Sequence, residues 1–301
     1  MALLDFFSRR GADEKAEMTF IDHLEELRWH VIRSVIAILI GAVVVMFFSN
    51  QIVDGILMAP TRPDFISARW FCKLSHLMHI GDTLCFPPVD AKFLENTMTG
   101  QFISYFTVGF IGGFIIAFPY VFWEFWRFVK PALKPNEVKG TRFVIFWVSF
   151  FFFLGSAFGY LVLGPFTFNF LANFQISGLN MITTKPTIND YLDNLTNLIL
   201  GCGIAFEMPV LSYALTKMGI ITPSFLKRSR KYAIVVILVL AAIITPSPDW
   251  YSQTIVFIPL FCLYELAVLV SVRVYKEQER KDKEERENKL KLYVNERDLV
   301  A

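Results

Sequence analysis

Long apolar stretches separated by shorter charged segments dominate the pattern of this chain. A helix needs roughly 20 mostly apolar residues to cross a bilayer, and six stretches approach or exceed that length. They run over about 31–48, 102–128, 143–166, 191–218, 232–244 and 255–272. The last two are short for an ordinary bilayer. The pattern therefore predicts an all-α integral membrane protein with six transmembrane helices.

Lys and Arg residues gather in alternate connections between these stretches. They crowd the segment before the first span, the second-to-third and fourth-to-fifth connections, and the segment after the sixth span. The third-to-fourth connection has only Lys185, and the fifth-to-sixth has no basic residue. Cytoplasmic loops carry an excess of basic residues, although long loops follow this rule weakly. We therefore expect both termini in the cytoplasm and the long loop of about 49–99 outside.

The charge pattern also divides the chain into two parts. Residues 1–273 form one six-span membrane domain, and residues 274–301 form a tail dense in Lys, Arg and Glu. Acidic and basic residues of the tail recur at the i,i+4 spacing of helical ion pairs, as at Glu277 and Lys281. We expect this tail to be a solvated cytoplasmic helix.

Composition agrees with a membrane protein and argues against an enzyme. The chain is 54% hydrophobic and 19% charged, whereas soluble domains average about 45–50% and about 25%. The sequence contains no H-E-x-x-H, G-x-S-x-G or Walker-type motif, which removes the most recognisable hydrolase and nucleotide sites. We expect no enzymatic activity, no cofactor, no metal and no nucleic-acid partner.

Motifs spread along most of the chain are similar to those of one membrane-protein family. They are 20–28 (FIDHLEELR), 118–119 (FP), 125–133 (FWRFVKPAL), Glu137, 206–210 (FEMPV), 245–249 (TPSPD) and 252–253 (SQ). In this order they resemble the TatC family, the multispanning receptor subunit of the twin-arginine protein translocase. The first of them is similar to that family's amino-terminal motif H-L-x-E-L-R.

The resemblance implies a function and a location. A TatC-type receptor binds twin-arginine signal peptides, joins single-span TatA/TatB-type subunits, and supports export of folded proteins driven by the proton-motive force. It implies a multi-pass protein of the bacterial cytoplasmic (inner) membrane that contacts lipid and self-associates. The alternative is a proton-coupled secondary transporter of a small solute, in which Glu207 and Glu265 would carry protons.

Two acidic residues are the expected binding groups for the signal arginines. The resemblance gives this role to Glu26 and Glu137, with Arg28, His23 and Leu24 in the same amino-terminal motif. A carboxylate accepts paired N–H donors from a guanidinium, so two carboxylates suit two adjacent arginines. The simpler interpretation makes Glu26 a favourable acid at a helix start and Glu137 part of a surface ion pair.

Polar residues also interrupt the later spans. Glu207 lies within the fourth, where a charged group costs at least about 2.5–3.5 kcal/mol. It therefore either serves transport or makes an interhelical hydrogen bond. Glu265 in the sixth span presents the same choice, whereas Glu124, near the cytoplasmic end of the second span, is expected to reach interfacial water or Arg127. Asp249 and Gln253, at the fifth-to-sixth turn, complete this intramembrane polar group.

Other residues are expected to have structural roles. Pro119 should kink the second span, and Pro209 should interrupt the fourth. Cys72 and Cys85 lie in the outer loop, which faces an oxidising compartment, so we expect a disulfide between them.

A G-x-x-x-G motif, Gly155 to Gly159, lies in the third span. Small residues at this spacing let two helices approach closely. We expect the motif to pack within this chain rather than against a partner subunit.

Overall fold

The structure, a computed structural model, is helical over most of the residues that it describes. These are residues 20–62, 65–77, 79, 93–129, 141–173, 186–245 and 250–300. Within those ranges the only β-type pairing is an isolated bridge between Leu94 and Thr187. Three residues singled out from the sequence, Cys85, Glu137 and Asp249, lie outside the described residues.

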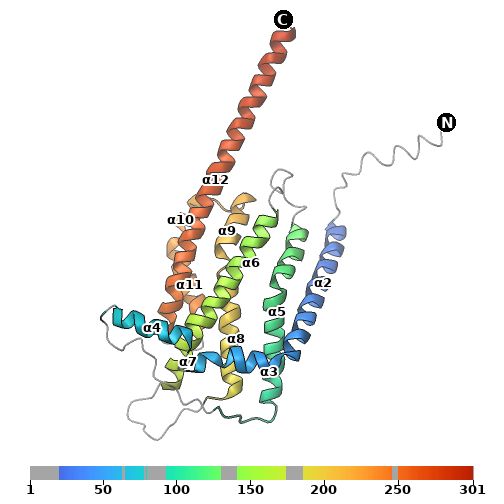
Figure 1. Cartoon of the computed structure of the whole chain (residues 1–301). Helices are drawn as coiled ribbons and strands as arrows, with labels where there is room; N and C mark the ends of the chain where they lie inside the picture. The colour runs from blue at the N-terminus through green and yellow to red at the C-terminus, as the bar shows by residue number, and fades with distance from the viewer. Residues whose placement is uncertain are drawn as a thin grey trace, which may run out of the picture.

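Long helical segments run along a common direction and form a bundle (Figure 1). They are α2 (Phe20–Phe47), α5 (Gly100–Val129), α6 (Thr141–Phe158) continued by the π-helical η5 (Gly159–Leu163) and by α7 (Gly164–Asn173), α8 (Ile188–Ala205) followed by α9 (Met208–Lys217), α11 (Arg230–Ile244) and α12 (Trp250–Val300). Each covers one of the six apolar stretches, so the all-α prediction is confirmed for the described residues.

Shorter helices lie at the two ends of the bundle. They are α3 (Ser49–Ile52), η2 (Val53–Leu57), η3 (Ala59–Thr61) and α4 (Ile66–Leu77) after α2, and α10 (Pro223–Arg228) before α11. Helices α3 and α4 run across the bundle at the end opposite the start of α2 (Figure 1). The predicted long outer loop therefore contains helices of its own.

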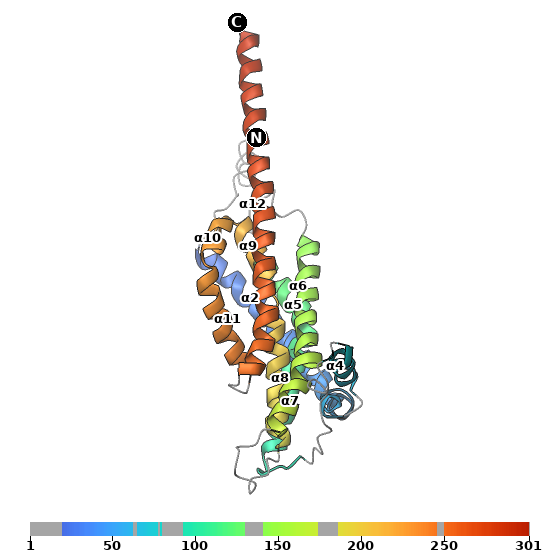
Figure 2. The ribbon, with the colours of Figure 1, turned by 90° about the vertical axis from the view of Figure 1, so that its left-hand side faces the viewer.

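Five of the described helical segments are long and apolar enough to cross a membrane. They cover 25–47, 100–129, 144–172, 188–217 and 253–289. Helix α11 has 15 residues and reaches only about 22 Å, less than the roughly 30 Å of a bilayer's hydrocarbon core. Figure 2 shows α11 and the start of α12 ending part-way along the bundle, while α7 and α8 continue further. The fifth stretch is short, as expected, and its crossing stays a prediction.

Helix α12 is longer than the predicted sixth span. The apolar stretch ends at about residue 272, but the helix continues to Val300 and extends beyond the bundle (Figure 1). Exposed i,i+4 ion pairs support this extension, with Lys281 Nζ 2.6 Å from Glu277 Oε1 and Lys283 Nζ 3.1 Å from Glu279 Oε1. Such pairs stabilise a helix locally. The prediction that the tail is helical is therefore confirmed.

Pro209 lies at a break in a span, whereas Pro119 lies inside a continuous helix. Helix α8 ends at Ala205 and α9 begins at Met208, so the fourth span is interrupted at Glu207 with Pro209 in the first turn of α9. Proline is tolerated in a first turn because the N–H that it lacks would have no helical partner there. Pro119 lies inside α5, which continues as one helix past it.

Glycines bring the backbones of α2 and α5 into contact. A Cβ atom added to Gly113 would lie 2.3 Å from the backbone nitrogen of Ala42, and one added to Gly41 would lie 2.7 Å from the carbonyl oxygen of Gly113. No larger residue fits at either position without moving a helix. This close approach sets α2 against α5 along their length.

The G-x-x-x-G motif does the same for α6 and α8. A Cβ on Gly155 would lie 2.5 Å from the carbonyl oxygen of Cys202, and one on Gly159 would lie 2.7 Å from that of Leu198. Packing of this motif within the chain is therefore confirmed.

Candidate functional site

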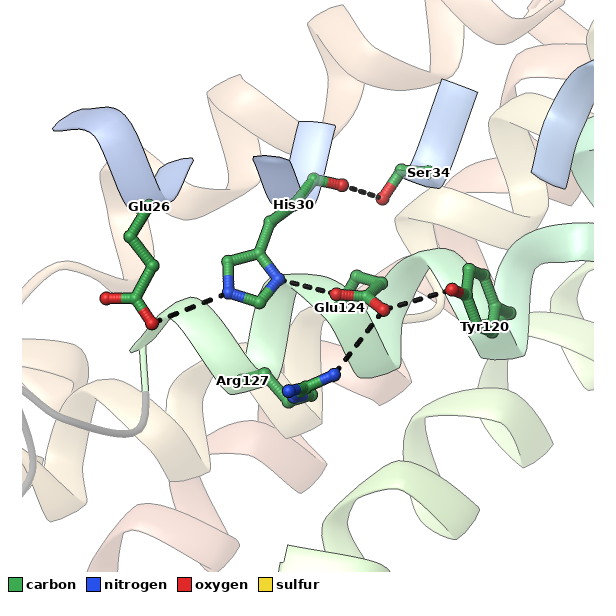
Figure 3. A network of polar contacts seen from close by, with 6 residues as sticks. All are labelled: Glu26, His30, Ser34, Tyr120, Glu124 and Arg127. Atoms are coloured by element: carbon green, nitrogen blue, oxygen red, sulfur yellow. Dashed lines mark hydrogen bonds and ion pairs between the residues drawn. The ribbon is translucent and has the colours of Figure 1, made fainter. Parts of the chain in front are cut away.

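A buried carboxylate lies between α2 and α5 near one end of the bundle. Glu124 of α5 is only 1% exposed, and both of its oxygens have partners (Figure 3). The Nδ1 atom of His30 lies 2.5 Å from Oε2, and the hydroxyl of Tyr120 donates to Oε1 at 3.0 Å. Nη1 of Arg127 lies 3.7 Å from the same Oε1. The charge is thus surrounded by donors.

His30 joins this carboxylate to a second one. The ring is 7% exposed, and its Nε2 atom lies 3.8 Å from Oε1 of Glu26. The edge of the ring packs against Phe128 of α5, with centroids 6.4 Å apart. Glu26 is more open, with 37% of its side chain exposed. The chain of contacts therefore runs from a buried acid on α5 to a half-exposed acid on α2.

Helical spacing explains why these groups meet. Glu26 and His30 are four positions apart on α2, and Tyr120 and Glu124 are four apart on α5. Residues at this spacing lie on one face of a helix, one turn above another. The close α2–α5 packing turns the two polar faces toward each other (Figure 3).

Arg127 carries the network out to the surface. It is 45% exposed, and its guanidinium lies over the ring of Trp123, 5.0 Å from the ring centroid. Arginine often stacks on an aromatic face while pairing with a carboxylate. The partly exposed end of the network is therefore composed of Glu26 and Arg127.

The structure places only some of the predicted signal-peptide residues. Glu26 belongs to the network, and its Oε2 atom is buried with no hydrogen-bond partner among the described residues. Arg28 is exposed. His23 and Leu24 lie in the first turns of α2, but their side chains are outside the described set. Glu137 is also outside it, so its pairing with Glu26 stays a prediction.

Comparison with known proteins decides the family. The model of the family "Sec-independent protein translocase protein (TatC)" matches residues 22–259. This chain belongs to the TatC family. Its relatives include TatC of Blattabacterium sp. subsp. Periplaneta americana, 41% identical over 88% of this chain and 99% of that protein. TatC of Desulforapulum autotrophicum is 33% identical over 90% of each chain.

The fold agrees with solved TatC structures. A crystal structure of the twin-arginine translocase receptor TatC in DDM superposes with a TM-score of 0.65 at 31% identity. The match covers 83% of this chain and 99% of that chain. The TatC resemblance drawn from the motifs is therefore confirmed, and the chain is a multi-pass membrane protein of a protein translocase family.

In this TatC chain the intramembrane polar residues have different surroundings. Glu207 is 8% exposed at the α8–α9 break, and its Oε1 atom has no hydrogen-bond partner among the described residues. Gln253 donates from Nε2 to the carbonyl oxygen of Leu238 at 3.0 Å. Glu265 accepts from Nη2 of Arg230 at 2.8 Å. Gln253 and Glu265 thus tie α12 to α11, and a transport role for Glu207 stays a prediction.

The outer cysteines are partly described. Cys72 of α4 is disulfide-bonded, and Cys85 lies outside the described residues, so the Cys72–Cys85 pairing stays a prediction. Cys202 and Cys262 are free.

The sequence interpretation of this TatC chain missed the buried pair of His30 and Glu124. It expected Glu124 to reach interfacial water or Arg127. The contact with Arg127 confirms that expectation, and Glu124 is in addition almost fully buried. The i,i+4 spacing of Glu26 and His30 predicts that these two side chains lie on one face of a helix. It does not predict that α2 packs against α5.

Removing the buried acid should destabilise the fold strongly. Glu124→Ala leaves His30 buried without its partner, a type of change that costs on the order of 3–5 kcal/mol. Glu265→Ala breaks an ion pair between partly exposed groups, 50% and 34% exposed, and should cost less than about 1 kcal/mol. Thermal unfolding of both variants in detergent measures the difference. Equal stability losses would show that the buried network does not hold the helices together.

Proposed function

We propose that this chain is the receptor and core subunit of a twin-arginine translocase, with Glu26 as one acceptor for the signal arginines. The observation that carries this proposal is the geometry of Glu26. One oxygen of its carboxylate lies 3.8 Å from Nε2 of His30, and the other is buried with no hydrogen-bond partner among the described residues. An unsatisfied buried acceptor is costly, and an arriving guanidinium donor would remove that cost.

The second acceptor in this proposal is Glu137. It follows α5, whose last residue is Val129, and Glu124, Arg127 and Trp123 lie in the final turns of that helix. The loop that contains Glu137 therefore starts from the network that contacts Glu26. Two carboxylates near this end of the bundle would match two adjacent guanidinium groups, each with a fixed fork of donors. Lysine offers a point charge without the fork, so Arg-Arg signals are favoured over Lys-Lys.

An apolar groove beside the network suits the apolar part of a signal peptide. It lies between α2 and α5 and has a volume of about 430 Å³. Its lining consists of Arg33, Ile36, Ala37, Ile40, Gly41, Val44, Ile116, Ala117 and Tyr120. Tyr120 also contacts Glu124, so the groove adjoins the polar network. Binding of apolar residues here would supplement the modest contribution of an exposed ion pair.

In the proposed orientation the network faces the cytoplasm and all six segments span the bacterial inner membrane. The distribution of Lys and Arg supports this, as does the position of the α12 tail on the same side as the start of α2 (Figure 1). Cysteine labelling from the outer face should reach Thr83→Cys but not Asn136→Cys. The reverse labelling pattern would overturn the orientation.

The proposed partners follow from the same assignment. They are signal peptides of folded precursors, single-span TatA/TatB-type subunits, surrounding lipid and further copies of this chain, with export driven by the proton-motive force. The solute-transporter alternative is not carried forward, because the family is one of protein translocases.

Loss of both carboxylates should remove signal recognition. Glu26→Ala or Glu137→Ala should each weaken crosslinking of a twin-arginine precursor to the membrane complex, by roughly fivefold for one partly exposed ion pair. The double variant should nearly abolish it while the protein still inserts and assembles. Glu265→Ala, which removes an acid elsewhere in the bundle, serves as the matched control. Undiminished crosslinking in the double variant would exclude both residues from the site.

A further inference from the structure

The imidazole of His30 lies between two carboxylates of different character. Toward α5, its Nδ1 atom contacts Glu124, which is buried and already satisfied by Tyr120 and Arg127. Toward the start of α2, its Nε2 atom faces Glu26, which is partly exposed. One Glu26 oxygen has no hydrogen-bond partner in the part of the chain that the structure describes. The ring therefore stands between the buried part of the network and its more exposed carboxylate.

Burial excludes Glu124 from direct contact with a signal peptide. At 1% exposure it offers no surface to an external guanidinium. Its contribution to the site must therefore pass through the group that it holds, and that group is the His30 ring. The ring in turn has little freedom, because Phe128 packs against it and α2 lies in backbone contact with α5 near Gly41 and Gly113.

A fixed histidine restricts Glu26. A free glutamate side chain loses up to about 1.5–2 kcal/mol of rotamer entropy when it is ordered. An acceptor that is ordered before binding does not add that cost to the binding step. The Nε2 atom of the ring lies 3.8 Å from Oε1 of Glu26, so the ring limits the positions open to that carboxylate.

We propose that His30, held by Glu124, is a positioning residue that orients Glu26 to accept a signal arginine and so sets the preference for arginine over lysine. This inference rests on the proposed function of Glu26. Orientation matters more for a guanidinium than for an ammonium group, because the guanidinium donors are fixed in a plane. A misdirected carboxylate therefore loses more affinity for Arg-Arg than for Lys-Lys.

A conservative variant separates positioning from folding. In His30→Asn the amide nitrogen occupies roughly the place of Nδ1 and can still donate to Glu124, whereas no atom replaces Nε2 beside Glu26. Glu26→Gln keeps the size of the side chain and removes its charge. Thr216→Val removes a buried 2.8 Å hydrogen bond to Ser271 between α9 and α12, and so controls for a general loss of stability.

The test is a double-mutant cycle read by equilibrium binding of labelled Arg-Arg and Lys-Lys signal peptides to the purified full-length chain. Glu26→Gln should weaken Arg-Arg binding about fivefold, and His30→Asn about threefold. Both losses of affinity match the contribution expected from one partly exposed ion pair. The double variant should bind no more weakly than Glu26→Gln alone. The ratio of Arg-Arg to Lys-Lys affinity should fall in His30→Asn and stay unchanged in Thr216→Val.

The possible outcomes separate this inference from the proposed function. If the losses of the two single variants multiply in the double variant, His30 acts independently of Glu26 and the positioning role is wrong, while Glu26 keeps its place in the site. Unchanged binding or unchanged selectivity in His30→Asn also overturns the inference alone. Normal Arg-Arg binding by Glu26→Gln would remove Glu26 from the site and overturn both.

Discussion

Burial of the Glu124 carboxylate is the constraint on which the rest of this structure depends. A charge taken out of water costs several kcal/mol unless donors surround it, and α5 alone supplies only Tyr120 and Arg127. The third donor, His30, comes from α2. The buried acid therefore requires that α2 lie beside α5 in one register, with His30 at the level of Glu124.

Small residues make that register sterically possible. In a bilayer the lipid tails are as apolar as the helix surfaces, so helices associate through close packing and interhelical polar contacts. Gly41 and Gly113 supply the close packing between α2 and α5, and the His30–Glu124 contact supplies the polar specificity. Gly155 and Gly159 bring α6 against α8 in the same way. The site and the bundle are thus products of the same packing.

Much of the fold was predictable from the sequence, but the buried network was not. Runs of apolar residues locate the helices, because backbone N–H and C=O groups in lipid must form hydrogen bonds within a helix. Motifs such as FIDHLEELR indicated the family and the role of Glu26. The helical tail was also predictable, because its charges recur at i,i+4 spacing, and α12 continues through it to Val300. The contact of Glu124 with Arg127 was predictable, whereas its contact with His30 was not, because the pairing of helices far apart in sequence has no local signature.

The central claim is that a buried acid, acting through His30, holds Glu26 ready for a signal arginine. An experimental structure of the chain with a bound twin-arginine signal peptide tests it most directly. The account predicts an arginine guanidinium within about 3 Å of the Glu26 carboxylate, the separation of charge-assisted hydrogen bonds, with the His30–Glu124 contact intact. Arginines bound away from Glu26, or a His30 ring turned away from Glu124 in the complex, would contradict it.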